Sequence, residues 1–134
     1  MKNEEKKLLL KDLCARLPYR VVCYSFQFKI DGNHCECNGK LAGINNGYFY
    51  LSDRESVNGG KTYDEGYLEV KPYLRSLSSM NEAEKDDYQY ITERWMYDAS
   101  YSIADSLDWL NEHHFDYRGL IEKGLALEAP EGMY

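Results

Sequence analysis

The amino-acid sequence predicts a single α+β domain, with an N-terminal helix, a small antiparallel sheet of three to five strands, and C-terminal helices. Three observations predict this class. Apolar residues first recur at helical spacing, then alternate with polar residues between Asn-Gly and Asp-Gly turns, and finally return to helical spacing behind two capping signals. At 134 residues the chain has the length of one domain that can bury its own core.

Residues 1–17 are expected to form the first helix. Leu9, Leu13 and Leu17 recur at four-residue spacing, and the lysines between them point to the opposite side. Pro18 cannot continue a helix and disfavours helical geometry in the residue before it. The helix should therefore end at Leu17.

Residues 18–75 are expected to form the antiparallel sheet, either open or partly closed like a barrel. In residues 21–30 an apolar set alternates with a polar one, as in a strand with one buried face. The apolar set is Val22, Tyr24, Phe26, Phe28 and Ile30. Hairpin turn signals then separate short strands expected at residues 37–44, 48–51 and 67–70. Residues 53–66 should form a long exposed loop, and Pro72 should take an edge or exit position.

Two capping-box spacings predict the starts of helices within residues 76–128. Ser79 with Glu82 opens the first helix, and Ser102 with Asp105 opens the second. The apolar stripe of the first helix consists of Tyr88, Ile91 and Trp95. The apolar stripe of the second consists of Ile103, Leu107, Leu110 and His114.

A third, short helix is expected to start at Asp116 and to close near Gly124. All three helices should pack over the sheet. Residues 129–134 contain a proline and a glycine, so they should form a loose tail.

Charge is unevenly distributed along the chain. Residues 1–17 carry five basic and three acidic side chains, residues 18–75 carry seven of each, and residues 76–134 carry four and thirteen, for a net charge of −7. Such a balance disfavours direct binding to a nucleic-acid backbone. The acidic stretch that begins the first C-terminal helix is either a solvated face or a mimic of DNA phosphates. Its members are Glu82, Glu84, Asp86 and Asp87.

No segment has the composition of a membrane span or a signal peptide. The longest stretch without a charged residue is residues 41–52, twelve residues long. The leucine run near the N-terminus has three residues, too few for the apolar region of a signal peptide. We therefore expect a cytoplasmic protein with no membrane partner.

Three segments carry a family resemblance. Residues 8–19 are LLLKDLCARLPY, residues 71–80 contain KPYLR and LSSM, and residues 108–126 contain DWLN and HHFDYRGLIEKGLA. They resemble a group of short uncharacterised proteins of gut anaerobes and their phages or mobile elements. That group has no assigned activity, so the resemblance implies a phage or mobile-element setting but no functional residue. Where the group suggests a glycine and a proline, this chain has Arg20 and Ser76, which affects local turn geometry.

Three cysteines and a histidine could in principle hold zinc. Cys23, His34, Cys35 and Cys37 supply three thiolates and an imidazole, a legal tetrahedral set. However, Cys-x-Cys lacks the usual two-residue spacing, and no second paired motif exists. Without an export signal, four reduced thiols and no cofactor are the expectation.

The adjacent histidines suggest a metal or a general base. His114 continues an apolar stripe, which favours a core histidine, and His113 lies near a helix C-terminus, where a cationic ring complements the dipole. The chain has no nucleophile, phosphate-loop or zinc-protease motif. An enzyme is therefore not expected, and a metal-dependent enzyme at His113 and His114 is the weakest hypothesis.

Tyrosine is unusually frequent, with thirteen residues. Tyr48 and Tyr50 share one face of an expected strand, and Tyr67 lies on a neighbouring one. Tyrosine suits binding surfaces because its ring is apolar and its tip is polar. The leading hypothesis is thus a non-enzymatic binding protein that acts on a protein partner. The alternative is a nucleotide-like small molecule held by tyrosines and Arg118, and a homo-oligomer is left open.

Overall fold

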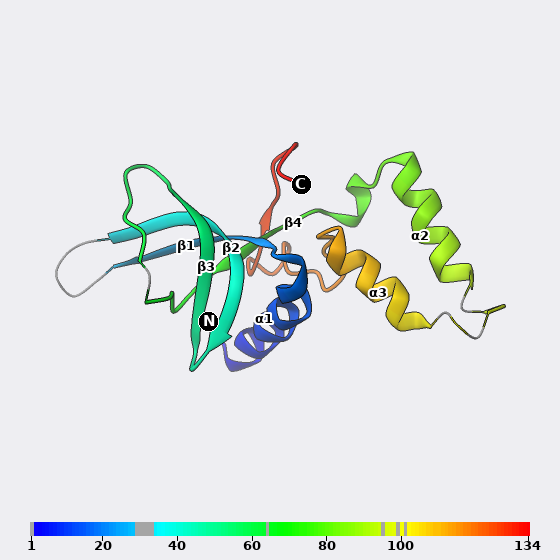
Figure 1. Cartoon of the computed structure of the whole chain (residues 1–134), viewed down its shortest axis with the longest axis horizontal. Helices are drawn as coiled ribbons and strands as arrows, with labels where there is room; N and C mark the ends of the chain where they lie inside the picture. The colour runs from blue at the N-terminus through cyan, green and yellow to red at the C-terminus, as the bar shows by residue number, and fades with distance from the viewer. Residues whose placement is uncertain (1, 29–33, 64, 95, 99, 101) are drawn as a thin grey trace.

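The computed structural model confirms the α+β class (Figure 1). It describes residues 2–28, 34–63, 65–94, 96–98, 100 and 102–134. The helices are α1 (Asn3–Arg16), α2 (Glu82–Arg94) and α3 (Ile103–Glu112), with 3-10 turns at Leu17–Tyr19 and Leu77–Ser79. The strands are β1 (Val22–Phe28), β2 (His34–Asn45), β3 (Tyr48–Ser56), β4 (Lys71–Leu74) and β5 (Leu127–Glu128). Within the described ranges no helix has the length and hydrophobicity needed to cross a membrane.

The five strands form one open sheet in the order β3-β2-β1-β4-β5, so the barrel alternative does not apply. All pairs are antiparallel except β4 with β5. Pro72 lies opposite Cys23 in β4, an interior strand, and not at the predicted edge. The missing N–H group of proline is tolerated there because β5 pairs only with Tyr73 and Leu74.

Two strand boundaries differ from the prediction. β3 continues to Ser56, so the predicted exposed loop over residues 53–66 is shorter than expected. Register shifts along β2 let the polar end of β3 remain paired. Residues 67–70 do not form a strand; Tyr67 alone forms a bridge, to Phe49 of β3.

The main core lies between α1 and the inner face of the sheet. The side of β1 that faces this core carries the set predicted to be polar, not the set predicted to be apolar. Cys23 and Ser25 are buried, whereas Phe26 is 42% exposed. The polar Ser25 is accommodated because its hydroxyl donates to the Glu69 carbonyl oxygen at 2.7 Å. Ile30 of the predicted strand lies outside the described residues.

One predicted helix cap is confirmed and one is wrong. Asp105 accepts a hydrogen bond from the Ser102 N–H at 2.6 Å, which starts α3 as expected. The capping box of α2 lies two residues later than predicted, between Asn81 and Glu84. Ser79 instead belongs to the preceding 3-10 turn.

The predicted third C-terminal helix is wrong. Residues 116–124 form turns, because Gly119 and Gly124 adopt positive φ angles of 72° and 73° that end helical geometry. Asp116 still caps backbone groups, accepting hydrogen bonds from the N–H groups of Leu120 at 2.9 Å and Ile121 at 3.0 Å.

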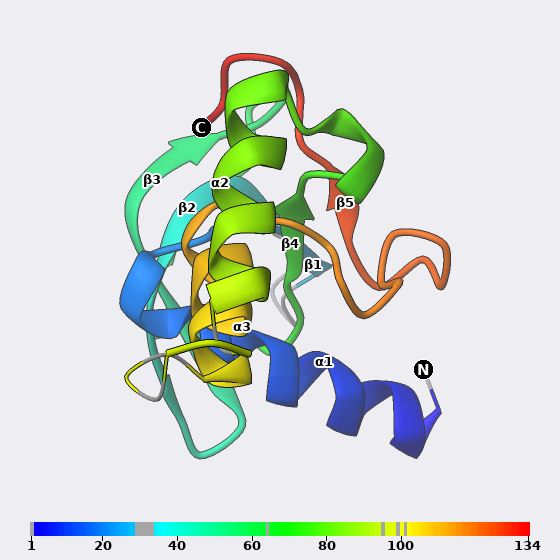
Figure 2. The same cartoon turned by 90° about the vertical axis from the view of Figure 1, so that its right-hand side faces the viewer.

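The two C-terminal helices do not cover the sheet as predicted. α2 and α3 pack against each other to one side of it, as Figures 1 and 2 show from two directions. Their shared core is small, with Trp109, Leu110 and Phe115 buried.

The last six residues are not a loose tail. The Tyr134 ring stacks on His114 with centroids 3.7 Å apart. Its hydroxyl donates to the Tyr73 carbonyl oxygen at 2.7 Å and accepts from the Val22 N–H at 3.0 Å. These contacts attach the segment to β1 and β4.

Candidate interaction surfaces

The three tyrosines of the predicted surface lie close together, but only two face outward. Tyr67 is fully buried, and its hydroxyl contacts the Cys37 sulfur at 3.2 Å and accepts from the Tyr63 N–H at 3.0 Å. Burial raises the pKa of the Tyr67 phenol. Tyr67 is therefore a core residue, unavailable to a partner.

Tyr48 and Tyr50 lie on the outer face of β3, with Tyr48 38% exposed. Gly66, whose φ angle is 92°, lies against both tyrosine side chains. A side chain at this position would bring its Cβ within 3.1 Å of Tyr48 Cβ and Tyr50 Cε1. Glycine is required here by both the backbone angle and the close approach of the ring.

An apolar groove of about 440 Å³ lies between α1, the β2–β3 hairpin and residues 68–70. Phe49 lines it, whereas Tyr48 and Tyr50 on either side of Phe49 do not. Two of its leucines are strongly exposed, Leu10 at 44% and Leu68 at 59%. Among the described residues that line it, Lys6 and Glu69 are charged. Such a groove can receive apolar side chains from another molecule. Because side chains alternate along a strand, Tyr48 and Tyr50 point to the side of β3 opposite to Phe49. We call this groove and the β2–β3 hairpin that borders it, including Tyr48 and Tyr50, the hairpin face.

A second, polar cleft of about 560 Å³ lies between the start of α2 and residues 128–134. Inside it the Arg75 guanidinium holds both carboxylate oxygens of Glu84 at 2.7 Å and lies 4.2 Å from the centroid of the Phe115 ring. The hydrogen bonds from Arg75 lower the pKa of Glu84. Glu128 and Glu131 also line the cleft, so its charge does not suit a phosphate-bearing ligand.

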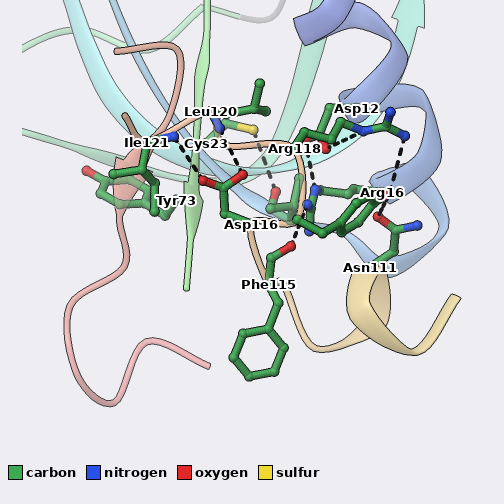
Figure 3. A network of polar contacts seen from close by, with 12 residues as sticks. Asp12, Arg16, Cys23, Tyr73, Asn111, Phe115, Asp116, Arg118, Leu120 and Ile121 are labelled. Atoms are coloured by element: carbon green, nitrogen blue, oxygen red, sulfur yellow. Dashed lines mark hydrogen bonds and ion pairs between the residues drawn. The ribbon is translucent and has the colours of Figure 1, made fainter. Parts of the chain in front are cut away.

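Arg118, proposed from sequence as a ligand-binding residue, has its charge already paired. Its Nε contacts Asp12 Oδ1 at 3.1 Å, and Arg16 Nε contacts Asp12 Oδ2 at 2.8 Å (Figure 3). Arg16 also donates to the Phe115 carbonyl oxygen at 2.7 Å. Asp12 and Arg16 are fully buried, so this ion triad joins α1 to the turn that follows α3.

The two histidines lie in aromatic stacks. His113 lies 4.1 Å from the Trp109 ring, and its Nδ1 is 2.9 Å from the Trp109 carbonyl oxygen. Burial, together with the charges of Arg16, His113 and Arg75, lowers the pKa of His114 to about 4. Both imidazoles therefore pack against aromatic rings, His113 on Trp109 and His114 on Tyr134.

The cysteines are free thiols, and Cys23, Cys35 and Cys37 are buried. Burial raises the pKa of the Cys23 thiol. His34 precedes Cys35 in β2 and therefore points to the opposite face. Among the described residues, no three His, Cys, Asp or Glu side chains form a group that could hold a metal ion.

Residues 82–112, comprising α2, α3 and their connection, form a protrusion that we call the acidic arm (Figure 1). Of the predicted acidic face, Glu82, Asp86 and Asp87 are exposed, whereas Glu84 is paired with Arg75. α2 has no buried residue within its described length. Trp95, from its predicted apolar stripe, lies outside the described residues.

The predicted apolar stripe of α3 is wrong at Ile103 and Leu107, which are 66% and 42% exposed, whereas Leu110 is buried as predicted. Trp109 instead sets the rotation of the helix by stacking on Tyr88 and Phe115, with centroids 5.6 Å and 5.7 Å away. Spacing alone could not indicate which of two adjacent stripes faces inward. The large indole was the available signal, since Trp buries the most area.

The chain matches no protein-family model, no curated protein and no solved structure in the comparisons made. Within its described residues, the α+β fold exposes apolar side chains on both the hairpin face and the acidic arm.

Proposed function

We propose that this chain is a non-enzymatic binding protein that engages a protein partner through the hairpin face. The observation that carries the proposal is the open apolar groove of about 440 Å³ between α1, the β2–β3 hairpin and residues 68–70. Contiguous apolar surface of this kind is typical of sites that another molecule covers.

The composition of the hairpin face favours a protein over a small polar ligand. Leu10 and Leu68 are each about half exposed, so covering them would gain roughly half of the ~1.5–3 kcal/mol that a fully exposed leucine gains on burial. Tyrosine is enriched among the residues that dominate binding energy at protein interfaces. A partner segment that places one or two apolar side chains in the groove and covers Tyr48 would use both features.

The resemblance to proteins of gut anaerobes and their phages supports a more specific setting. A binding protein of this size, encoded by a phage or mobile element, would act as an accessory factor on a host protein. The cytoplasm is the compartment that we propose for this interaction.

Site-specific photo-crosslinking in the producing cell tests the proposal. A photoreactive phenylalanine analogue replaces Tyr48 in one variant, and Ser78, an exposed residue of the 3-10 turn before α2, in a matched control. We expect a discrete protein adduct from position 48 that is absent from position 78. The substitution Leu68→Glu should abolish the adduct while leaving the melting temperature unchanged, because Leu68 is 59% exposed.

Equal adducts from both positions, or an adduct at position 48 that survives Leu68→Glu at full strength, would show that the hairpin face is not the binding site. The paired substitutions Tyr48→Ala and Tyr50→Ala provide a second check. They should reduce the yield of partner recovered with the protein without unfolding it.

A further inference from the structure

The acidic arm carries all of the formal net charge of the protein. Residues 82–112 contain nine acidic and two basic side chains, for a net −7 that equals the total for the chain. The remaining residues are balanced overall. A surface that covers the arm must therefore be basic.

The acidic arm also exposes a large share of apolar side chains. Its exposed apolar residues are Tyr90 at 53%, Met96 at 64%, Tyr97 at 82%, Ile103 at 66% and Leu107 at 42%. A surface that is only solvated would have no use for this many exposed apolar groups. The complementary surface must therefore be apolar as well as basic.

One surface of this same chain meets both requirements. On α1, Lys2, Lys6 and Leu10 follow one another at four-residue spacing, which places them in one row of the helix surface. Lys6 and Leu10 line the apolar groove. Lys7 and Lys11 are also exposed on α1. Its buried residues Asp12 and Arg16 neutralise each other, and Glu4 and Glu5 only partly offset the four lysines.

The two surfaces lie on different sides of the molecule. In Figure 1 the acidic arm extends to one end of the molecule, whereas the tip of the β2–β3 hairpin lies toward the other side of the sheet. Although α1 and α3 contact each other within one chain, the outer side of the arm and the groove can also meet in two different copies of the chain.

We propose that the protein associates with itself head to tail, with the acidic arm of one copy docked on the hairpin face and α1 lysines of the next. The proposal rests on the proposed function, since it names the partner of the hairpin face as a second copy. The two surfaces differ, so the contact is heterologous, and each added copy leaves one arm and one groove free. Opposite charges steer the contact, and apolar side chains from both surfaces leave water.

Light scattering during size-exclusion chromatography of the purified full chain, at increasing concentration, provides the first measurement. The average mass should rise continuously above the monomer value of 15.7 kDa. It should fall back toward that value in about 1 M salt, where the screening length shrinks to roughly 3 Å.

Two single-surface variants then test the head-to-tail arrangement. Leu68→Glu places a negative charge in the groove, and Leu107→Lys places a positive charge on the arm; both sites are exposed, so the fold should be retained. Each variant alone should be monomeric. Their mixture should form a dimer of twice 15.7 kDa, because one intact arm and one intact groove remain. Leu77→Glu, at an exposed leucine outside both surfaces, should behave as the unmodified protein.

A mass that stays at 15.7 kDa at every concentration would overturn the proposal. So would a mixture of the two variants that remains monomeric, since that result indicates a symmetric dimer or no contact. The crosslinking experiment distinguishes the two proposals. A Tyr48 adduct with a different polypeptide, from a protein that is monomeric when pure, would leave the proposed function standing and reject self-association.

Discussion

The region that contains α1 and the sheet is stabilised differently from the acidic arm. Among the described residues, the core under the sheet contains fourteen buried side chains, whereas the core between α2, α3 and Phe115 contains three. The arm therefore depends on the stacked Trp109 and on ties to the rest of the chain. One tie is the Arg75–Glu84 pair, and a second is the ion triad centred on Asp12 at the foot of α3.

The difference in core size explains why the sheet region supplies most of the stability of the chain, while the arm exposes apolar side chains. A region with a large core can bury nearly all its apolar side chains, while a two-helix region cannot. The arm consequently keeps Ile103 and Leu107 in water. The same shortage of core that lowers its local stability leaves it able to bind.

Asp12→Ala should produce the largest effect, because it removes the carboxylate that pairs with Arg16 and Arg118 and so joins α1 to the turn after α3. Arg16 would be left fully buried without its counter-charge, which typically costs about 3–5 kcal/mol. Urea unfolding followed by circular dichroism measures the loss. Lys11→Ala, at the neighbouring exposed position, should change stability by less than about 0.5 kcal/mol. A loss below about 1 kcal/mol for Asp12→Ala would contradict the structural role of the triad.

Trp109→Ala should separate the two regions. Loss of its stacking on Tyr88, His113 and Phe115 should cost about 3 kcal/mol, most of it within the arm. Hydrogen exchange should show faster amide exchange in α2 and α3, with β1 and β2 still protected. Ile103→Ala, in the same helix but 66% exposed, serves as the control. Equal loss of protection in the sheet would show that the regions are not separable.

Acid should weaken the junction where His114 stacks on Tyr134. The folded-state pKa of His114 is lowered from 6.5 to about 4, so the unfolded chain takes up a proton first as pH falls. Stability should therefore decrease between pH 6.5 and pH 4, by on the order of 2–3 kcal/mol. In His114→Asn, which tolerates the positive φ angle of 63°, this part of the pH dependence should disappear. An unchanged pH profile would exclude His114 as its source.

Glu84→Gln should have the smallest effect, about 1 kcal/mol. The amide oxygen can still accept the hydrogen bond from Asn81, so the variant isolates the charge pairing with Arg75. Because the folded-state pKa of Glu84 is lowered, the contribution of the pair is present near neutral pH and is lost on acidification. Glu82→Gln, whose side chain is 90% exposed, should leave the thermal unfolding midpoint unchanged.

Much of the fold could be predicted from sequence because local signals specify local structure. The helix before Pro18, the hairpin turns and the Ser102–Asp105 cap all depend on residues within a few positions of each other. β5 could not be predicted, since two residues carry no periodic pattern. It forms because the glycine turns after Asp116 return the chain alongside β4.

The candidate surfaces were predictable only in part. The position of Tyr48 and Tyr50 on one face follows from strand alternation. The burial of Tyr67 and the ion pair of Arg118 with Asp12 could not be predicted in this way, because both depend on contacts with residues thirty or more positions away. The groove joins α1 to residues 68–70, and no local pattern links these segments.

By itself the sequence determined the class of the fold, the order of its main elements and the concentration of negative charge between residues 82 and 112. Composition and short-range geometry are sufficient for these properties. The tertiary structure alone decided which faces are buried. Burial is settled by competition between distant segments for a limited core, and in that competition Cys23 and Trp109 are buried while Phe26 and Ile103 remain in water.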